Sequence, residues 1–268
     1  MLSSLIIVSK QAFWVLNNSL WILNLLGSAF VIWRLYFVGL QKTYRFFFAY
    51  MVLALARTVI LFQFNPLKKT YYHIWLLTQP LLWLCFVLVV SELYSLVLRQ
   101  YRGIYSVSRW FFFGAVTLST IISASTVFTT MAGSASRPPL LYYSALIERG
   151  VVTGLAIFLF LLLTLVAWFA VPLSRNLLTH CCVYSAYFLF NNVVMLYWHS
   201  GSKNAAYWGS TWKLSSALIC YSCWVFLLSR RGEERTASFG LGRDPVEEKR
   251  LLGQLETLNA TLLSTARK

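Results

Sequence analysis

The sequence predicts an all-α, polytopic membrane protein of seven transmembrane helices, with the N-terminus outside and the C-terminus inside. Three observations lead to this fold class. Hydrophobic residues make up 59% of the 268-residue chain, and charged residues only 12%. The apolar residues lie in seven long runs, and a helix needs about 20 such residues to cross a hydrocarbon core of about 30 Å. Basic residues gather in every second connection between the runs.

The predicted spans follow one another with short connections, and each is long enough to cross a bilayer as a helix. They occupy roughly residues 13–35, 46–64, 73–98, 110–131, 146–172, 177–198 and 205–229. The first residues, MLSSLIIVSKQAFW, lack the charged start and the cleavage site of a removable signal peptide. We expect them to lead into the first span along the membrane interface.

The net charge of +15 would suggest nucleic-acid binding in a soluble protein, but here the basic residues indicate topology, because cytoplasmic loops are rich in Lys and Arg. Those after the odd-numbered spans are Arg34, Lys42, Arg45, Arg99, Arg102, Arg109, Arg175, Arg230, Arg231 and Arg235. The opposite connections hold Lys10, Lys68, Lys69, Arg137, Arg149 and Lys203. We therefore place the first set in the cytoplasm and expect the lipid bilayer, and no nucleic acid, as partner.

The chain divides into a transmembrane bundle, residues 1–229, and a cytoplasmic tail, residues 230–268. The tail opens with the polar stretch RRGEERTASFGLGRDPVEEKR, which we expect to be a flexible linker. An amphipathic helix is predicted after Pro245, because leucines recur with the spacing of a narrow apolar seam, at Leu251, Leu255, Leu258 and Leu262. This helix can pair with another protein, lie on the membrane or pack against the bundle.

Polar residues inside the spans gather in their outer halves, and they form the candidate ligand site. Arg57 falls near the middle of its span, and Lys213 lies about 10 Å below the outer edge of the seventh. Charged groups at such depths usually face the bundle interior or a water-filled cavity. The expected result is an outward-facing chamber with a net positive field for a small anionic or carboxylate-bearing ligand, with the residues Arg57, Gln79, Asn191, Asn192 and Lys213.

The same residues also fit a structural role. Lys213 can direct its ammonium group outward, Arg57 can bond to backbone carbonyls or to Gln79, and asparagines can join helices by hydrogen bonds. Small hydroxylated residues on the fourth span follow helical spacing and predict a packing face, at Ser119, Ser123, Thr126 and Thr130. Under this interpretation the protein is a non-catalytic structural or accessory subunit of a larger complex, bound to a membrane protein partner through the tail or the fourth span.

A second constellation lies in the inner halves of the sixth and seventh spans, where HCCVYSAY and CYSC place His180, Cys181, Cys182, Cys220 and Cys223. Thiolate and imidazole are ligands for zinc and haem, so a membrane metal or redox protein is a further alternative. Both motifs lack the turn usual in structural zinc sites, and cysteine is a common buried filler. We therefore predict buried free thiols and no cofactor.

Two acids precede residue 230, Glu92 and Glu148. Glu92 lies near the inner edge of the third span, where an ion pair with Arg99 or Arg102 is expected and a proton-relay role is the alternative. Glu148 opens the fifth span near the outer interface.

No metalloprotease, nucleophile-elbow or phosphate-loop motif is present, which argues against an enzyme.

The sequence resembles a group of bacterial seven-helix membrane proteins without assigned activity. The similar segments are YRFFFAYMVLALARTVILF, YYHIWLLTQPLLWLCFVLVVSELYSLVLRQY, LIERGVVTGLAIFLFLLL and WKLSSALICYSCWVFLL. The resemblance covers most of residues 40–229. It implies a multi-pass protein of the bacterial cytoplasmic membrane and transfers no functional residue. The leading interpretation is a receptor-like protein in which ligand binding moves the sixth and seventh helices and the tail.

Overall fold

The computed structural model describes residues 2–64, 69–99, 101, 104–105, 110, 112–119, 121, 139–169, 171–199, 205–234, 236–237 and 245–266. The long helices are α1 (Leu2–Val38), α2 (Arg45–Phe62), α3 (Lys69–Val97), α5 (Pro139–Trp168), α6 (Arg175–His199), α7 (Ala205–Leu227) and α9 (Pro245–Ala266). Shorter elements are η1 (Leu40–Lys42), α8 (Arg230–Glu234) and the two-residue strands β1 (Leu173–Ser174) and β2 (Thr236–Ala237). Residues 112–119 are also helical.

Within the described ranges, five segments are long and apolar enough to cross a membrane. They are Val15–Val38, Arg45–Phe62, Lys69–Val97, Tyr143–Trp168 and Arg175–Tyr197. Each overlaps a predicted span, which confirms a multi-pass helical membrane protein. Helix α7 is not among the five, and it carries Lys213 together with several serines. The predicted fourth span, 110–131, falls mostly outside the described residues.

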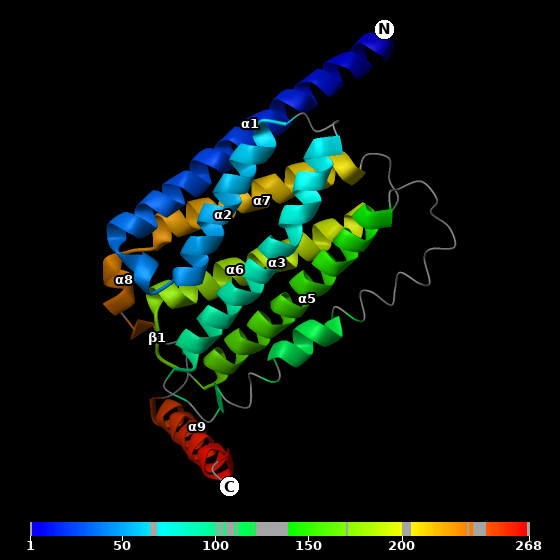
Figure 1. The fold of residues 1–268 in the computed structure, drawn as a ribbon. Helices are drawn as coiled ribbons and strands as arrows, with labels where there is room; N and C mark the ends of the chain where they lie inside the picture. The colour runs from blue at the N-terminus through cyan, green and yellow to red at the C-terminus, as the bar shows by residue number, and fades with distance from the viewer. Residues whose placement is uncertain are drawn as a thin grey trace.

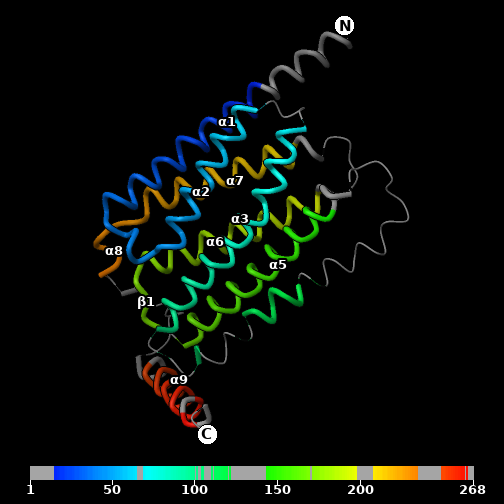
Figure 2. The backbone as a smooth tube through the Cα atoms, in the orientation of Figure 1, coloured from blue at the N-terminus to red at the C-terminus, as the bar shows by residue number. Residues whose placement is uncertain are grey.

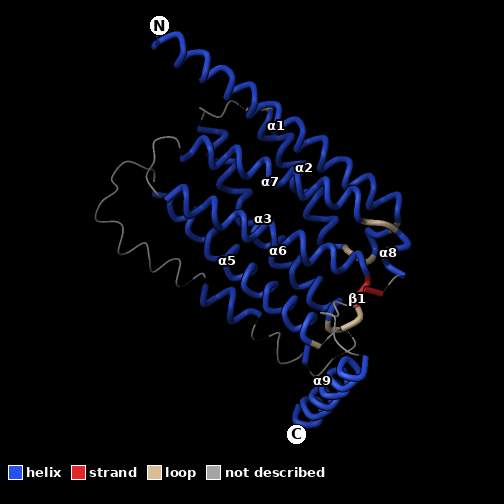
Figure 3. Tube along the Cα trace, turned by 180° about the vertical axis from the view of Figure 1, so that it is seen from behind, coloured by secondary structure: helices blue, strands red, loops and turns tan. Residues whose placement is uncertain are grey.

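Six long helices form a closed ring. Each contacts the next in the order α1, α2, α3, α5, α6 and α7, and α7 returns to contact α1. Figure 1 shows these helices side by side, with α1, α2 and α7 on one flank and α3, α5 and α6 on the other. The view from behind shows the same arrangement (Figure 3). A ring of this kind has an interior that every member can reach with side chains.

One end of the ring, where α1 passes through η1 into α2, is closely packed with aromatic residues. The imidazole of His180 on α6 lies 4.4 Å from the ring of Tyr44 and 4.6 Å from that of Phe47, centroid to centroid. Tyr184 and Trp224 extend this cluster, with their ring centroids 5.0 Å apart. Such packing closes this end of the ring, since protein interiors leave few voids larger than a water molecule.

The N-terminus of α2 is capped by a carboxylate from the neighbouring helix α3. Glu92 accepts hydrogen bonds from the backbone N–H of Phe46, at 3.0 and 3.2 Å, and from that of Phe47, at 3.2 Å. The first N–H groups of a helix have no partner within the helix, and the helix dipole favours a negative charge there. Glu92 turns toward α2 and forms no ion pair with Arg99 in the described part of the chain, and the other expected partner, Arg102, lies outside the described residues.

The segment after α7 docks against the start of α6 through a set of contacts that we call the tail latch: Asn176 with Ser229, Gly232 and Glu233. The amide of Asn176 donates to the carbonyl of Ser229 at 2.7 Å and to the Glu233 carboxylate at 3.1 Å. Its carbonyl accepts from the backbone N–H of Ser229 at 3.2 Å. Strands β1 and β2 pair just beyond, in antiparallel register. Ser229 and Glu233, which follow α7, are therefore anchored to α6.

Tyr44 adds a further contact to this region. Its hydroxyl donates to the Glu233 carboxylate at 3.1 Å. Burial and the neighbouring Glu233 charge raise the pKa of the Tyr44 phenol well above its ordinary value. The phenol therefore stays protonated and serves as a donor to Glu233. In the backbone trace, α8 lies beside the lower end of α1 and α2 (Figure 2).

Candidate functional site

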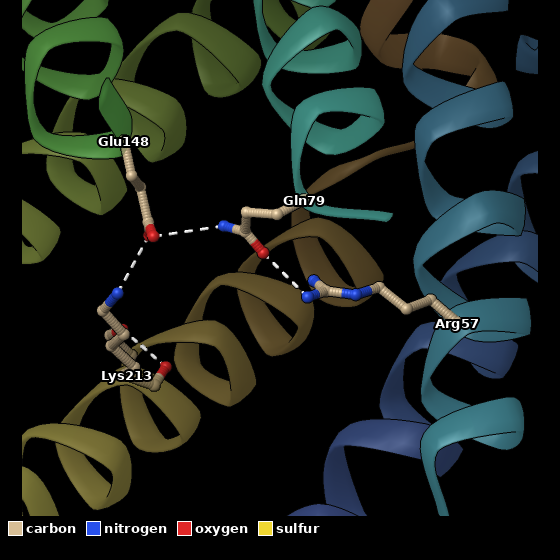
Figure 4. A network of polar contacts seen from close by, with 5 residues as sticks. Arg57, Gln79, Glu148 and Lys213 are labelled. Carbon is tan, nitrogen blue, oxygen red and sulfur yellow. Dashed lines mark hydrogen bonds and ion pairs between the residues drawn. The ribbon is translucent and has the colours of Figure 1, made fainter. Parts of the chain in front are cut away.

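Four polar side chains from four helices form a connected network inside the ring (Figure 4). Arg57 on α2 donates from Nη2 to Oε1 of Gln79 on α3, at 2.7 Å. Gln79 donates from Nε2 to Oε2 of Glu148 on α5, at 3.1 Å. Lys213 on α7 donates from Nζ to Oε1 of the same carboxylate, at 2.9 Å. Glu148 thus receives the amide and the ammonium on separate oxygens.

Burial makes these contacts necessary. The side chains of Lys213 and Glu148 are 30% and 9% exposed, and Gln79 is buried. A buried charge without a partner is strongly unfavourable, and removing one member of a buried pair leaves such a charge behind. Gln79 uses both ends of its amide, since it accepts from Arg57 and donates to Glu148. It therefore links Arg57 to Glu148 and, through that carboxylate, to Lys213.

The network borders a cavity of about 390 Å³. Every helix of the ring contributes to the wall, so the cavity lies in the ring's interior. The lining is mixed, with the four network residues together with apolar and aromatic side chains. The aromatic residues that line it are Trp21, Tyr50, Tyr71, Trp75, Phe86, Tyr187 and Tyr221. A concave, mostly apolar wall with a few convergent polar groups is typical of small-molecule sites.

Arg57 retains hydrogen-bonding capacity at this wall. Its Nε is buried and has no hydrogen-bond partner among the residues that the structure describes. The guanidinium carbon lies 5.8 Å from the ring centroid of Trp75, within the range of a cation–π contact. A guanidinium has five N–H donors in a planar fork that matches a carboxylate, and the contact with Gln79 accounts for one of them.

The structure brings Arg57, Gln79 and Lys213 together and leaves Asn191 and Asn192 apart from them. Neither asparagine lines the cavity. Asn192 accepts a hydrogen bond from the Thr153 hydroxyl at 2.6 Å and donates to the Phe188 carbonyl at 3.0 Å. The Thr153 contact joins α6 to α5, because this part of α6 turns toward that helix, and the Phe188 contact lies within α6.

Glu148 is the network residue that sequence reasoning did not include. The expected fifth span begins at residue 146, which would place Glu148 at the membrane interface. In the structure α5 begins at Pro139, so Glu148 lies well inside the helix. One signal in the sequence could have identified it: Glu148 is one of only two acidic residues before residue 230, so few carboxylates could pair with Lys213.

The inner histidine and cysteines do not gather around one point. Cys181 and Cys220 are buried, whereas Cys182 is exposed and Cys223 is half-buried. His180 is enclosed by aromatic rings. Within the described part of the chain, no three His, Cys, Asp or Glu side chains form a group that could hold a metal ion.

No protein-family model matches the chain, and no curated protein or solved structure matches it. The resemblance to bacterial seven-helix proteins therefore stays a prediction, and the functional argument rests on the site.

Proposed function

We propose that the protein is a receptor-like membrane protein whose outward-facing chamber binds a small anionic or carboxylate-bearing ligand. One observation carries the proposal: Arg57 and Lys213 border a single cavity, and Glu148 is the one acidic residue among the described residues of its lining. The two cations and one carboxylate give the wall a net positive charge. Cations in a partly dehydrated cavity attract anions much more strongly than they would in water.

The proposed topology has seven spans, an external N-terminus and a cytoplasmic tail. It follows from the excess of basic residues in the odd-numbered connections. Arg34 supports it, because its guanidinium donates to the Leu228 carbonyl at 2.8 and 3.2 Å at the packed end of the ring, away from the cavity. The cavity then belongs to the outer half of the bundle. A bacterial cytoplasmic membrane is proposed from the sequence resemblance alone.

Coupling to the tail follows from chain connectivity. Helix α7 carries Lys213 in its outer half and ends at Leu227, two residues before Ser229 of the tail latch. A ligand that changes the position of Lys213 moves α7 as a whole, because a helix transmits displacement along its axis. The contacts of Asn176 with Ser229 and Glu233 are the bonds that such a movement would strain.

Charged thiol reagents test both the orientation and the field of the chamber. Ser210 lines the cavity and is outside the network, so Ser210→Cys places a thiol beside it. In intact cells we expect membrane-impermeant methanethiosulfonates to label this thiol, with the anionic sulfonate reagent favoured several-fold over the cationic trimethylammonium reagent. Gln63→Cys, at an exposed site at the end of α2, corrects for intrinsic reactivity, and the unsubstituted protein corrects for native thiols. Labelling only from the cytoplasmic side, or a preference for the cationic reagent, would contradict the proposal.

An accessory subunit is the second candidate function, and a specific observation favours it. Asn24 on α1 donates to the Leu214 carbonyl on α7 at 3.0 Å, and Thr153 bonds to Asn192 between α5 and α6. These amides hold helices together, as expected of a scaffold. A membrane protein that co-purifies in stoichiometric amount, combined with equal labelling of Ser210→Cys by both reagents, would favour this function.

A further inference from the structure

The charge and the lining of the cavity indicate a narrower class of ligand than anions in general. We propose that the chamber selects a monovalent anion with an aromatic or apolar body, which binds through Arg57, and that Glu148 sets this valence. The inference rests on the proposed function, because it specifies the ligand of the same site.

The first step is the charge balance. Arg57 and Lys213 contribute two positive charges to the lining, and Glu148 contributes one negative charge. A monovalent anion brings this set to neutrality. A divalent anion would leave an uncompensated negative charge in a cavity whose lining is partly apolar and aromatic, where unpaired charge is unfavourable. Valence is therefore a property that this cavity can discriminate.

The second step identifies the cation that meets the ligand. The Lys213 ammonium is already paired with Glu148 at 2.9 Å. In the described part of the chain no carboxylate lies within ion-pair distance of Arg57: its Nη2 donates to the neutral amide of Gln79, and its Nε has no hydrogen-bond partner. A guanidinium fork can bind a carboxylate with two parallel hydrogen bonds. Arg57 is therefore the anchoring residue, and Glu148 acts by keeping Lys213 occupied.

The third step concerns the body of the ligand. The volume of about 390 Å³ falls near the lower end of the ~300–1,000 Å³ range of small-molecule pockets. A bare inorganic anion would occupy a small part of it and leave the aromatic wall wet. Seven aromatic residues contribute to that wall, and burying an apolar group of the ligand against them stabilises the complex. A ligand that joins an anionic group to an aromatic or apolar body contacts both Arg57 and the aromatic wall of the cavity.

Calorimetric titration of the full-length protein in phosphatidylcholine nanodiscs at pH 8 tests the inference with four probes. They are 3-phenylpropionate, the dianion phenylsuccinate, the neutral 3-phenyl-1-propanol, and acetate, which lacks the apolar body. We expect 3-phenylpropionate to bind at least tenfold more tightly than each of the others. Arg57→Met should weaken its binding ten- to a hundredfold, as expected for the loss of a charge-assisted contact.

Glu148→Gln provides the decisive variant, because it removes one charge at nearly constant size and leaves both cations for the ligand. In this variant phenylsuccinate should bind at least as tightly as 3-phenylpropionate. Preference for phenylsuccinate in the unsubstituted protein would overturn the valence rule while leaving an anion chamber in place. Equal binding of acetate and 3-phenylpropionate would overturn the apolar body. If no anion binds more tightly than 3-phenyl-1-propanol, the proposed function itself fails. Titration of the unsubstituted protein with the four probes decides the valence preference, the need for an apolar body and anion binding itself, even if a variant does not fold.

Discussion

Replacing Glu148 with alanine is expected to lower the free energy of unfolding by about 3 kcal/mol, at the lower end of what removing one member of a buried ion pair costs. The substitution deprives the Lys213 ammonium of its carboxylate and the Gln79 amide of its acceptor. The lower end of the range applies because the Lys213 side chain is 30% exposed and keeps some access to water. Unfolding by sodium dodecyl sulfate in mixed micelles measures the loss.

A double-mutant cycle separates the pair from its surroundings. Lys213→Met keeps the length and the apolar stem of the lysine, so the double variant with Glu148→Ala should be less destabilised than the sum of the two single changes. Arg149→Ala is the matched control, because it removes a charge next to Glu148 that takes no part in the network. Strict additivity of Glu148→Ala and Lys213→Met would show that the two groups do not interact.

Replacing Asn176 with alanine is expected to release the tail and to destabilise the protein by about 3 kcal/mol. Asn176 is fully buried and makes three hydrogen bonds in the tail latch, to the N–H and the carbonyl of Ser229 and to the Glu233 carboxylate. Each buried partner left unsatisfied costs about 1–3 kcal/mol. Trypsin should then cleave after Arg230 and Arg231 much faster than in the unsubstituted protein, while the ring stays intact.

Two further variants control for this result. Gly232→Ala leaves Asn176 in place but adds a Cβ that would collide with its Oδ1, so it should accelerate the same cleavage. Gly253→Ala on α9 meets open space and should leave the cleavage rate unchanged. If Gly232→Ala is as resistant to trypsin as the unsubstituted protein, the latch does not hold the tail.

The membrane-spanning segments could be predicted because they depend on local composition. The second predicted span, 46–64, differs from α2 by only one or two residues at each end, since an apolar run of that length has few other solutions in a bilayer. The start of α5 was harder to predict from the sequence. Seven residues from Pro139 precede the expected span, and their inclusion changes Glu148 from an interfacial residue into a buried one.

The bond of Arg57 to Gln79 was one of the contacts expected under the structural interpretation, and it is confirmed. The other partners of the polar side chains could not be predicted, because they depend on how each helix is rotated and on which helices are neighbours. Gln79 and Arg57 were expected at similar depths, and the ring order places α2 beside α3, so they meet. Asn192 has a suitable depth too, but it faces α5 and bonds to Thr153. The partners of Glu92 could not be predicted either. The sequence around Glu92 does not indicate that its carboxylate accepts hydrogen bonds from the first N–H groups of α2.

An experimental density map of the gently purified protein in a lipid nanodisc tests the central claim most directly. The account predicts that Gln79 bridges Arg57 and Glu148, that Lys213 pairs with Glu148, and that all four side chains border one cavity inside the ring. Arg57 or Lys213 pointing into lipid, or side chains filling the space between them, would contradict the ligand chamber and leave the scaffold function in its place.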